Sequence, residues 1–236
     1  HKTMEEYYQA KKMLFSICDL AIVNIDDDYG KRLLDEISCD KYSYSSQTKA
    51  DFCAENVVIK SDKTEYDFCS NGEKSPISIP MPGIFNVANS IAAIASCIKL
   101  GIPKDKVISL ISTCKGVKGR CEVIPTGRDF TIICDYAHTP DALENILPSV
   151  KSYTKGRLIC LFGCGGNRDK TKRPKMAAAA AKFADRLIVT SDNPRDEVPM
   201  DIINDILVGL KGTDTPYDIE VDRKEAISHA VKIAQK

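Results

Sequence analysis

The sequence predicts an α/β protein whose second half contains a parallel sheet with helices on both faces. Three observations predict this class. Short apolar runs alternate with helix-forming stretches, and turn-forming residues separate them. The apolar run 187–190 is followed by Ser-Asp-Asn-Pro, which is typical of a buried parallel strand that breaks into a loop. At 236 residues the chain is long enough for one large domain or two ordinary ones.

The first half is less regular than the second. An amphipathic pattern predicts a helix near the beginning, and an apolar run followed by three aspartates predicts a strand and an acidic loop. Short β-rich segments and then two helices follow. The expected elements are a helix at about 3–17, a strand at 21–24, a loop at 26–28, β-rich segments between about 41 and 80, and helices near 86–100 and 104–114.

Four strand–helix pairs follow the Gly-rich stretch 116–119, which we take as the boundary between domains 1–118 and 119–236. Thr139-Pro140-Asp141 opens the first of these helices, with Pro at the favoured first position. Asp222 to Glu225 resembles a capping box and opens the last. The expected strands are 130–134, 157–162, 186–190 and 217–221, and the two helices between them are at about 174–184 and 201–210.

Composition excludes several classes of protein. Lysine plus arginine (33) equals aspartate plus glutamate (33), so the zero net charge argues against a broad nucleic-acid or membrane surface. No apolar run approaches the roughly 20 residues that span a bilayer. The ten cysteines are scattered in apolar segments without a C-x-x-C pair, so we expect reduced thiols in a cytoplasmic protein. Because the chain begins with His1 and ends within a predicted helix, we expect a fragment of a longer protein.

The residues Asp192-Asn193-Pro194-Arg195 follow the buried strand 186–190 and form the strongest candidate binding site. Ligands of open α/β sheets lie just beyond the carboxyl ends of strands. A carboxylate, an amide and a guanidinium there could hold a small zwitterion. The structural alternative is that Asp192 caps the next helix and Arg195 is a solvated charge. The Gly-rich segment 163–170, after the preceding strand, adds Arg168 at the same sheet edge; it is neither a Rossmann fingerprint nor a Walker A sequence.

Three further groups could carry chemistry. Asp135, Tyr136 and His138 lie between a strand and a helix N-terminus, where anions and ribose bind. Asn86 and Asn89 stand one turn apart at a helix start. Asn86 could simply be an N-cap, but paired amides can also read the edge of a nucleotide base. Lys11 shares a helix face with apolar residues; it is either a snorkelling lysine or one held near a phosphate or modified into a metal ligand.

Together these segments resemble the Mur ligases, the ATP-dependent amide-forming enzymes of peptidoglycan synthesis. The resemblance covers essentially the whole chain and is greatest to members that add the third residue to UDP-N-acetylmuramoyl-L-alanyl-D-glutamate. It implies part of a central ATPase domain followed by a Rossmann-like, amino-acid-binding C-terminal domain. The segments that carry it are Tyr8–Lys11, Phe85–Asn89, Gly119–Glu122, Asp135–Asp141, Phe162–Pro174 and Asp192–Arg195.

The resemblance also implies roles for individual residues. Lys11 matches the lysine that the family carbamylates with CO2, which gives an anion that helps hold Mg²⁺. This role implies that Lys11 lies on the inward face of its helix. Arg120 matches an arginine near the ATP phosphates, and Asp135 the acidic residue on the ribose. Asn86 and Asn89 match the adenine-side asparagines; Tyr136 and His138 flank that site, with His138 a candidate catalytic residue. Arg168, Asp192, Asn193 and Arg195 match the pocket for the incoming amino acid.

The implied reaction uses ATP to activate the glutamate side carboxylate as an acyl phosphate, which the amine of the incoming amino acid attacks. Members that add meso-diaminopimelate carry an arginine at the position of Arg195, where it meets the second carboxylate; members that add lysine carry another residue. The resemblance therefore favours meso-diaminopimelate as the amino-acid substrate, in a bacterial cytoplasmic enzyme expected to be a monomer.

Several family segments are absent from the chain: the P-loop and its following metal-binding Glu, the uridine-binding domain and a C-terminal Gly-Lys-Gly-His-Glu segment. We therefore expect the 236-residue chain alone not to turn over. A lysine-adding sibling and a folylpolyglutamate-synthetase-like ligase are the nearest alternatives. An NAD-dependent oxidoreductase is disfavoured because the glycine fingerprint fails, and a non-catalytic binding module would describe the fragment by itself.

Overall fold

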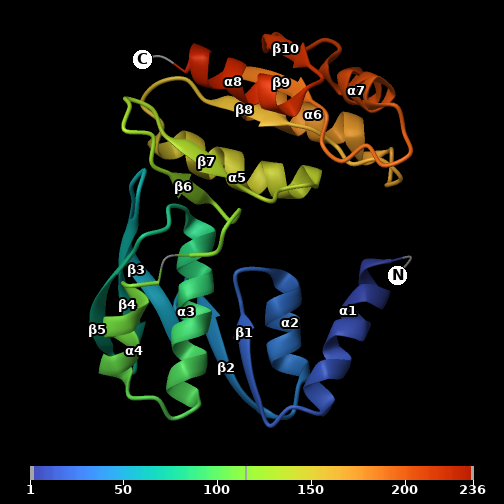
Figure 1. Cartoon of the computed structure of the whole chain (residues 1–236). Helices are drawn as coiled ribbons and strands as arrows, with labels where there is room; N and C mark the ends of the chain where they lie inside the picture. The colour runs from blue at the N-terminus through green and yellow to red at the C-terminus, as the bar shows by residue number, and fades with distance from the viewer. Residues whose placement is uncertain (1–2, 115, 235–236) are drawn as a thin grey trace. The chain divides into compact units, whose positions relative to one another are not determined.

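The computed structural model describes residues 3–114 and 116–234, and the chain divides into two compact units, 1–116 and 117–236 (Figure 1). The first unit contains a five-stranded sheet in the order β1-β2-β3-β4-β5. Strands β1, β2 and β3 run parallel, whereas β4 and β5 add to β3 as an antiparallel meander. The strands are β1 (Leu20–Asn24), β2 (Asp40–Ser45), β3 (Phe52–Ile59), β4 (Thr64–Ser70) and β5 (Glu73–Ile79).

The helices of the first unit include one that the sequence did not lead us to predict, α2. The residue that starts this helix lies in the predicted acidic loop 26–28. The Asp27 side chain accepts a hydrogen bond from the Gly30 backbone N–H at 2.8 Å and so caps the helix. The helices are α1 (Met4–Lys12), which continues as the 3₁₀ turn η1 (Met13–Ser16), α2 (Asp28–Glu36), α3 (Ile84–Lys99) and α4 (Lys104–Ile111).

The core of the first unit forms where α3 packs on the sheet. Val87, Ile91 and Ile94 recur at helical spacing along α3 and are fully buried. They meet the period-two side of β4, on which Tyr66 and Phe68 are buried. The spacing along α3 and the alternation along β4 bury their side chains in the same core. A shift of β4 by one residue would turn Tyr66 and Phe68 away from that core, so burial specifies the register of the strand.

The second unit begins with a short antiparallel ladder between β6 (Glu122–Ile124) and β7 (Ile132–Cys134). We predicted that β7, within 130–134, would follow the same strand–helix alternation as the later strands of the parallel sheet. It pairs with β6 instead, because a hairpin closes locally with little loop entropy and satisfies the backbone groups of both short strands.

A three-stranded parallel sheet in the order β10-β9-β8 forms the centre of the second unit. Each strand leads into a helix, as the sequence predicted. The elements are α5 (Pro140–Tyr153), β8 (Ile159–Phe162), α6 (Lys172–Phe183), β9 (Arg186–Thr190), α7 (Pro199–Leu207) with its 3₁₀ extension η2 (Val208–Leu210), β10 (Tyr217–Glu220) and α8 (Arg223–Ile233).

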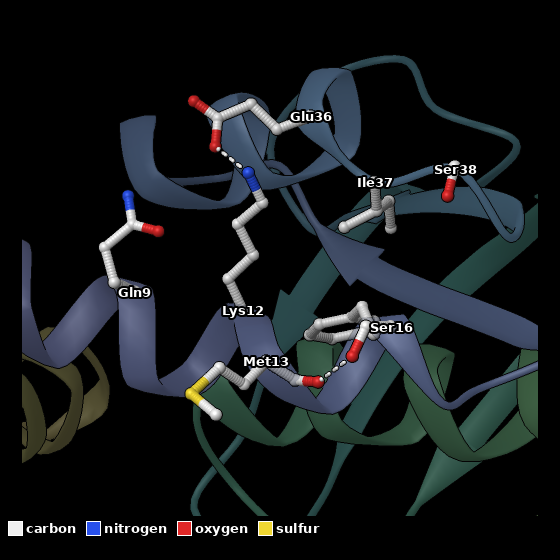
Figure 2. Close-up of a pocket in the computed structure, with 8 residues that line it drawn as sticks. Gln9, Lys12, Met13, Ser16, Glu36, Ile37 and Ser38 are labelled. Carbon is white, nitrogen blue, oxygen red and sulfur yellow. Dashed lines mark hydrogen bonds and ion pairs between the residues drawn. The ribbon is translucent and has the colours of Figure 1, made fainter.

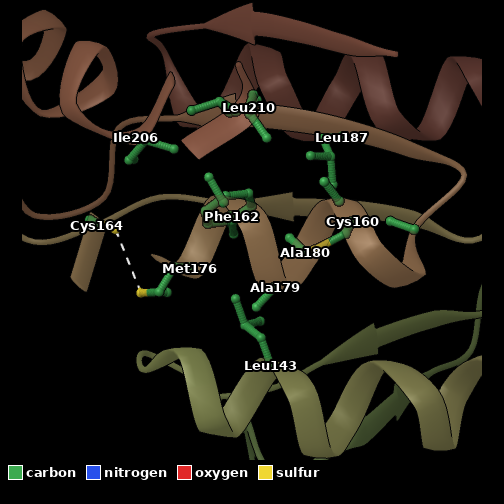
Figure 3. Close-up of a cluster of buried hydrophobic side chains, with 14 of the residues drawn as sticks. Leu143, Cys160, Phe162, Cys164, Met176, Ala179, Ala180, Leu187, Ile206 and Leu210 are labelled. Carbon is green, nitrogen blue, oxygen red and sulfur yellow. Dashed lines mark hydrogen bonds between the residues drawn. The ribbon is translucent and has the colours of Figure 1, made fainter. Parts of the chain in front are cut away.

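Both faces of this sheet are covered by helices, which confirms the predicted fold class. Leu187 and Val189 of β9 join a buried cluster with α5, α6 and α7 (Figure 3). Ile188 points to the opposite face and is fully buried, and α8, with buried Ala226, contacts all three strands. Strand β9 is therefore apolar on both sides, the reason for its continuous run of hydrophobic residues. No helix in the described ranges is long and apolar enough to cross a membrane.

Candidate functional site

The loops that follow β8 and β9 lie against each other at the carboxyl ends of these strands. The Gly166 backbone N–H donates a hydrogen bond to the Asn193 carbonyl at 2.8 Å, and the Arg195 guanidinium donates to the Gly166 carbonyl. A Cβ atom at Gly166 would lie 1.8 Å from the Pro194 carbonyl oxygen. Only glycine permits this approach, so the two loops, residues 163–171 and 191–198, are in direct backbone contact, and together they are called the paired loop.

Four predicted amino-acid-binding residues occupy this paired loop. A Cβ built at Gly165 would lie 3.1 Å from the Arg195 Nη1 atom and 4.0 Å from the Arg168 Cγ atom, so the two arginines flank this glycine. Both arginines are exposed, as are Asp192 and Asn193. Both arginines therefore lie at the same sheet edge, and the convergence of their two guanidiniums on one ligand stays a prediction.

The structural alternative for Asp192 is wrong. Helix α7 begins at Pro199 after Val198, six residues beyond Asp192, so Asp192 caps no helix there. Arg195 adopts a left-handed backbone with φ of 50°. This conformation is uncommon for a residue with a long side chain, and it persists only where the surrounding contacts impose it.

A second cluster joins β7 to the start of α5. The Asp135 carboxylate accepts hydrogen bonds from the backbone N–H groups of Cys121 (2.8 Å) and Ala137 (2.7 Å). Because Cys121 follows Arg120, this carboxylate fixes the position of the arginine relative to β7. The Arg120 guanidinium lies 5.0 Å from the centre of the Tyr136 ring, within reach of a cation–π contact.

Tyr136 also contacts His138, with ring centres 5.2 Å apart in an edge-on arrangement. The His138 Nδ1 atom lies 3.0 Å from the Tyr136 carbonyl oxygen, and Lys172 donates to the His138 carbonyl at 2.9 Å. The Tyr136 side chain is 63% exposed. The cluster thus presents an open aromatic face beside a guanidinium and a helix N-terminus, which suits a planar base or a phosphate.

The two asparagines of the first unit differ from each other. Asn86 is buried, and its side-chain amide donates to the Pro82 carbonyl at 2.8 Å. The N-cap of α3 is Gly83, so the N-cap alternative for Asn86 is wrong. Asn89, one turn later, is exposed and free to meet a ligand.

Lys11 lies on a face of α1 that is exposed in the described part of the chain, so its inward-facing position in the longer parent stays a prediction. Its neighbours on that face, Met4 (59% exposed) and Leu14 (57%), are also exposed. The opposite face packs inward through Tyr8 and Lys12. Lys12 donates to the Glu36 carboxylate at 2.7 Å beside a surface pocket (Figure 2). The aliphatic part of the Lys12 side chain packs inward while its ammonium group reaches a carboxylate. A count of apolar residues treats lysine as polar and therefore does not predict this inward position.

The inward face of α1 holds a network of charged groups around Glu36. Hydrogen bonds from Lys12, Arg32 and Tyr8 lower the pKa of Glu36 to about 2. The Arg32 guanidinium also stacks 4.3 Å from the centre of the Tyr8 ring. These contacts join α1 to α2 and leave Lys11 outside the network.

Two residues that our sequence analysis did not single out, Arg173 and Glu197, form an ion pair beneath the paired loop, in which Arg173 is fully buried and Glu197 is partly buried. The only signal in the sequence is their position, five residues after Arg168 and two after Arg195. Neither spacing distinguishes a buried pair from two surface charges, so the sequence alone could not have identified them. All ten cysteines are free thiols, in agreement with the expectation from their spacing.

Comparison with family models matches both units. Residues 1–97 match the Mur ligase middle domain, and residues 119–236 match the Mur ligase glutamate ligase domain. Within the second match lie the paired loop and the Arg120–His138 cluster.

Curated relatives and solved structures agree with these matches. The chain is 46% identical to UDP-N-acetylmuramoyl-L-alanyl-D-glutamate--2,6-diaminopimelate ligase 1 of Clostridium acetobutylicum, over all of this chain and 49% of the relative. A solved diaminopimelate ligase shares 32% identity over all of this chain and 50% of its own, with a TM-score of 0.65. Folylpolyglutamate synthase of Mycobacterium tuberculosis, at 16% identity, covers 99% of this chain and 52% of its own, with a TM-score of 0.77; it shares the fold. The chain spans about half the length of these relatives.

Proposed function

The chain belongs to the Mur ligase family, and from that premise we propose that it is part of an ATP-dependent ligase adding meso-diaminopimelate to UDP-N-acetylmuramoyl-L-alanyl-D-glutamate. Residues 1–118 form part of the central ATP-binding domain, and residues 119–236 form the amino-acid-binding domain. The observation that carries the proposal is that two exposed arginines, Arg168 and Arg195, lie beside Gly165 in the paired loop. Since the chain spans half the length of its relatives, the activity is that of the longer parent.

The paired loop is proposed to bind the incoming amino acid. Meso-diaminopimelate carries two carboxylates and two amines, so a pocket for it needs cations and anions in one place. Arg195 and Arg168 supply forked donors for carboxylates, while Asp192 and Asn193 supply acceptors for an ammonium group. Lysine has no second carboxylate to pair with a guanidinium, so we propose that this pocket binds it less well than meso-diaminopimelate.

The Arg120–His138 cluster and the asparagines of α3 are proposed to bind ATP. Asp135 retains acceptor capacity for ribose hydroxyls, because each of its oxygens accepts a single backbone hydrogen bond. Arg120 would meet the phosphates, with Tyr136 and His138 beside them. Asn89 is exposed and available to an adenine edge, whereas Asn86, held by Pro82, would orient the start of α3.

The residues present here do not fit a complete magnesium site. No group of three or more His, Cys, Asp or Glu side chains within the described ranges could hold a metal. Carbamylation of Lys11 would create one anionic ligand, and its exposed position leaves the amine open to CO2. The other ligands would have to come from the remainder of the parent, so no step is assigned to the metal here.

In the proposed reaction, an oxygen of the glutamate side carboxylate attacks the γ-phosphorus of ATP and ADP leaves. The amine of meso-diaminopimelate then attacks the resulting acyl phosphate. Phosphate leaves, and the amine loses a proton as the amide forms. Arg120 would stabilise charge on the transferring phosphoryl group, and the paired loop would hold the attacking amine near the acyl carbon.

We propose that the full-length parent acts in the cytoplasm. The test measures how its ligation activity depends on the amino acid supplied. Phosphate release is measured with meso-diaminopimelate and with L-lysine at matched concentrations. We expect kcat/KM to favour meso-diaminopimelate by at least ~100-fold, and Arg195→Ala to remove most of that preference. Equal use of the two amino acids by the unmodified enzyme would refute the role given to Arg195. Preference for lysine would instead identify the enzyme as the lysine-adding sibling.

A further inference from the structure

Arg173, in the first turn of α6, has a fully buried side chain. A charged guanidinium in the interior is costly unless acceptors surround it. Four hydrogen bonds from the two Nη atoms meet most of this requirement, whereas the buried Nε atom has no hydrogen-bond partner among the described residues. Two go to Glu197, at 2.8 and 3.0 Å; one goes to Asp205 at 2.8 Å, and one to the Gly165 carbonyl at 3.3 Å.

These four bonds connect separate elements of the second unit. Gly165 belongs to the loop after β8, Glu197 to the loop after β9, and Asp205 to α7. The bond pattern with Glu197 is bidentate, which fixes the orientation of both groups and not only their distance. Arg173 is therefore the point at which both halves of the paired loop are attached to the helices beneath them.

Glu197 extends the same network to the loop that bears Arg168. Its carboxylate accepts a hydrogen bond from the Asn167 backbone N–H at 2.6 Å and pairs with Lys170 at 3.1 Å. Asn167 has a left-handed backbone, with φ of 51°. The carboxylate thus holds the backbone of the residue that directly precedes Arg168, and Arg195 lies two residues before Glu197 itself.

The chemistry of this contact requires arginine. A lysine at position 173 could donate to one carboxylate but could not span Glu197, Asp205 and the Gly165 carbonyl with one planar fork. The same unit contains a second bidentate pair, Arg186 with Asp218 at 2.8 and 2.9 Å, at the opposite end of β9. That pair provides a matched control, because it touches neither loop.

We propose that Arg173, through Glu197, is a positioning residue that sets the spacing of Arg168 and Arg195 for a ligand with two carboxylates. The proposal rests on the function proposed above. Arg173 itself is buried beneath the loops and touches no substrate. Its effect is on geometry: the ion pair holds the Gly-rich loop at the distance at which both guanidiniums reach one molecule.

The test compares Arg173→Lys with Arg186→Lys, in the full-length ligase for kinetics and in the 236-residue chain for amide hydrogen exchange. Loss of the fork should raise the KM for meso-diaminopimelate about tenfold or more, leave the KM for ATP unchanged, and speed exchange of the Asn167 amide. Arg186→Lys should leave all three unchanged. Glu197→Gln retains the shape of the side chain and should give the same three changes as Arg173→Lys. It provides the test if Arg173→Lys folds poorly.

A merely structural role predicts another pattern, in which kcat falls with the fraction of folded enzyme and every KM stays the same. That pattern, or an unchanged Asn167 exchange rate in both Arg173→Lys and Glu197→Gln, would overturn the proposal. If the unmodified enzyme ligates no diamino acid at all, the proposed function fails. In that case the exchange rates still decide whether Arg173 holds the loops.

Discussion

Gly166→Ala is the sharpest perturbation of the paired loop that the structure offers. The added Cβ would lie 1.8 Å from the Pro194 carbonyl oxygen and 2.6 Å from its carbon, both backbone atoms that no rotamer change can move. Reaching ordinary contact at 3.4 Å requires the two loops to separate by about 1.6 Å. The hydrogen bond from Gly166 N–H to Asn193, now 2.8 Å, cannot survive that separation.

This separation acts on both stability and binding. Overpacking of this kind costs about 1–3 kcal/mol of unfolding free energy. Moving Arg195 away from Arg168 by more than an ångström should lower kcat/KM for meso-diaminopimelate by about 100-fold. The stability change is measured by urea denaturation followed by far-ultraviolet circular dichroism, and the kinetic change by phosphate release from the full-length ligase.

Two glycines provide controls for Gly166→Ala. Gly156→Ala places its Cβ in open space in the same unit and should change neither quantity. Gly30→Ala creates an equal overlap, 1.7 Å from the Asn24 carbonyl oxygen, in the first unit; it should lower stability but leave the KM for meso-diaminopimelate unchanged. A Gly166→Ala enzyme with unchanged kcat/KM would refute the claim that close loop contact sets the pocket.

Three further predictions concern the rest of the chain. Phe68→Ala should lower the unfolding free energy of the first unit by about 3–5 kcal/mol, because Phe68 is fully buried and stacks on Phe52; a loss below about 1 kcal/mol in urea titration would contradict this core. The pKa of Glu36 is lowered from 4.5 to about 2, so its stabilising contribution is present above pH 4.5 and lost as the pH falls towards 2. Thermal unfolding of Glu36→Gln should therefore depend less on pH across that range, and identical pH profiles would exclude this contribution. The purified 236-residue chain, given ATP, Mg²⁺ and both substrates, should release no phosphate above background; measurable ligation would show that the absent segments are dispensable.

The strand–helix alternation of the second half was readable from sequence because each element has a local cause. Strand β9 is apolar on both faces, and the N-caps Thr139 and Asp222 accept hydrogen bonds from the first turns of α5 and α8. Helix α2 was missed even though Asp27 caps it, because three consecutive aspartates also suit a loop. The pairing of β7 with β6 was missed because strand character does not specify a partner.

The predicted site residues show the same division. The positions of Asp192–Arg195 and of Gly163–Arg168 after consecutive parallel strands placed both at one sheet edge, since carboxyl ends of parallel strands meet there. Which face of α1 packs inward was not decided by counting apolar residues. Lys12 rather than Lys11 faces Glu36, because an ion pair with a distant segment outweighs the local pattern.

The sequence by itself therefore indicated the α/β class, the strand–helix alternation from β8 to α8 and a set of candidate site segments, because propensity, capping and periodicity act between residues close in the chain. The tertiary structure alone decided that Gly166 touches Pro194 and that Arg173 is buried against Glu197 and Asp205. These contacts join residues that are 24 to 32 positions apart. Their energies depend on burial and on the direction of a guanidinium fork, and neither exists until the sheet and its helices have packed.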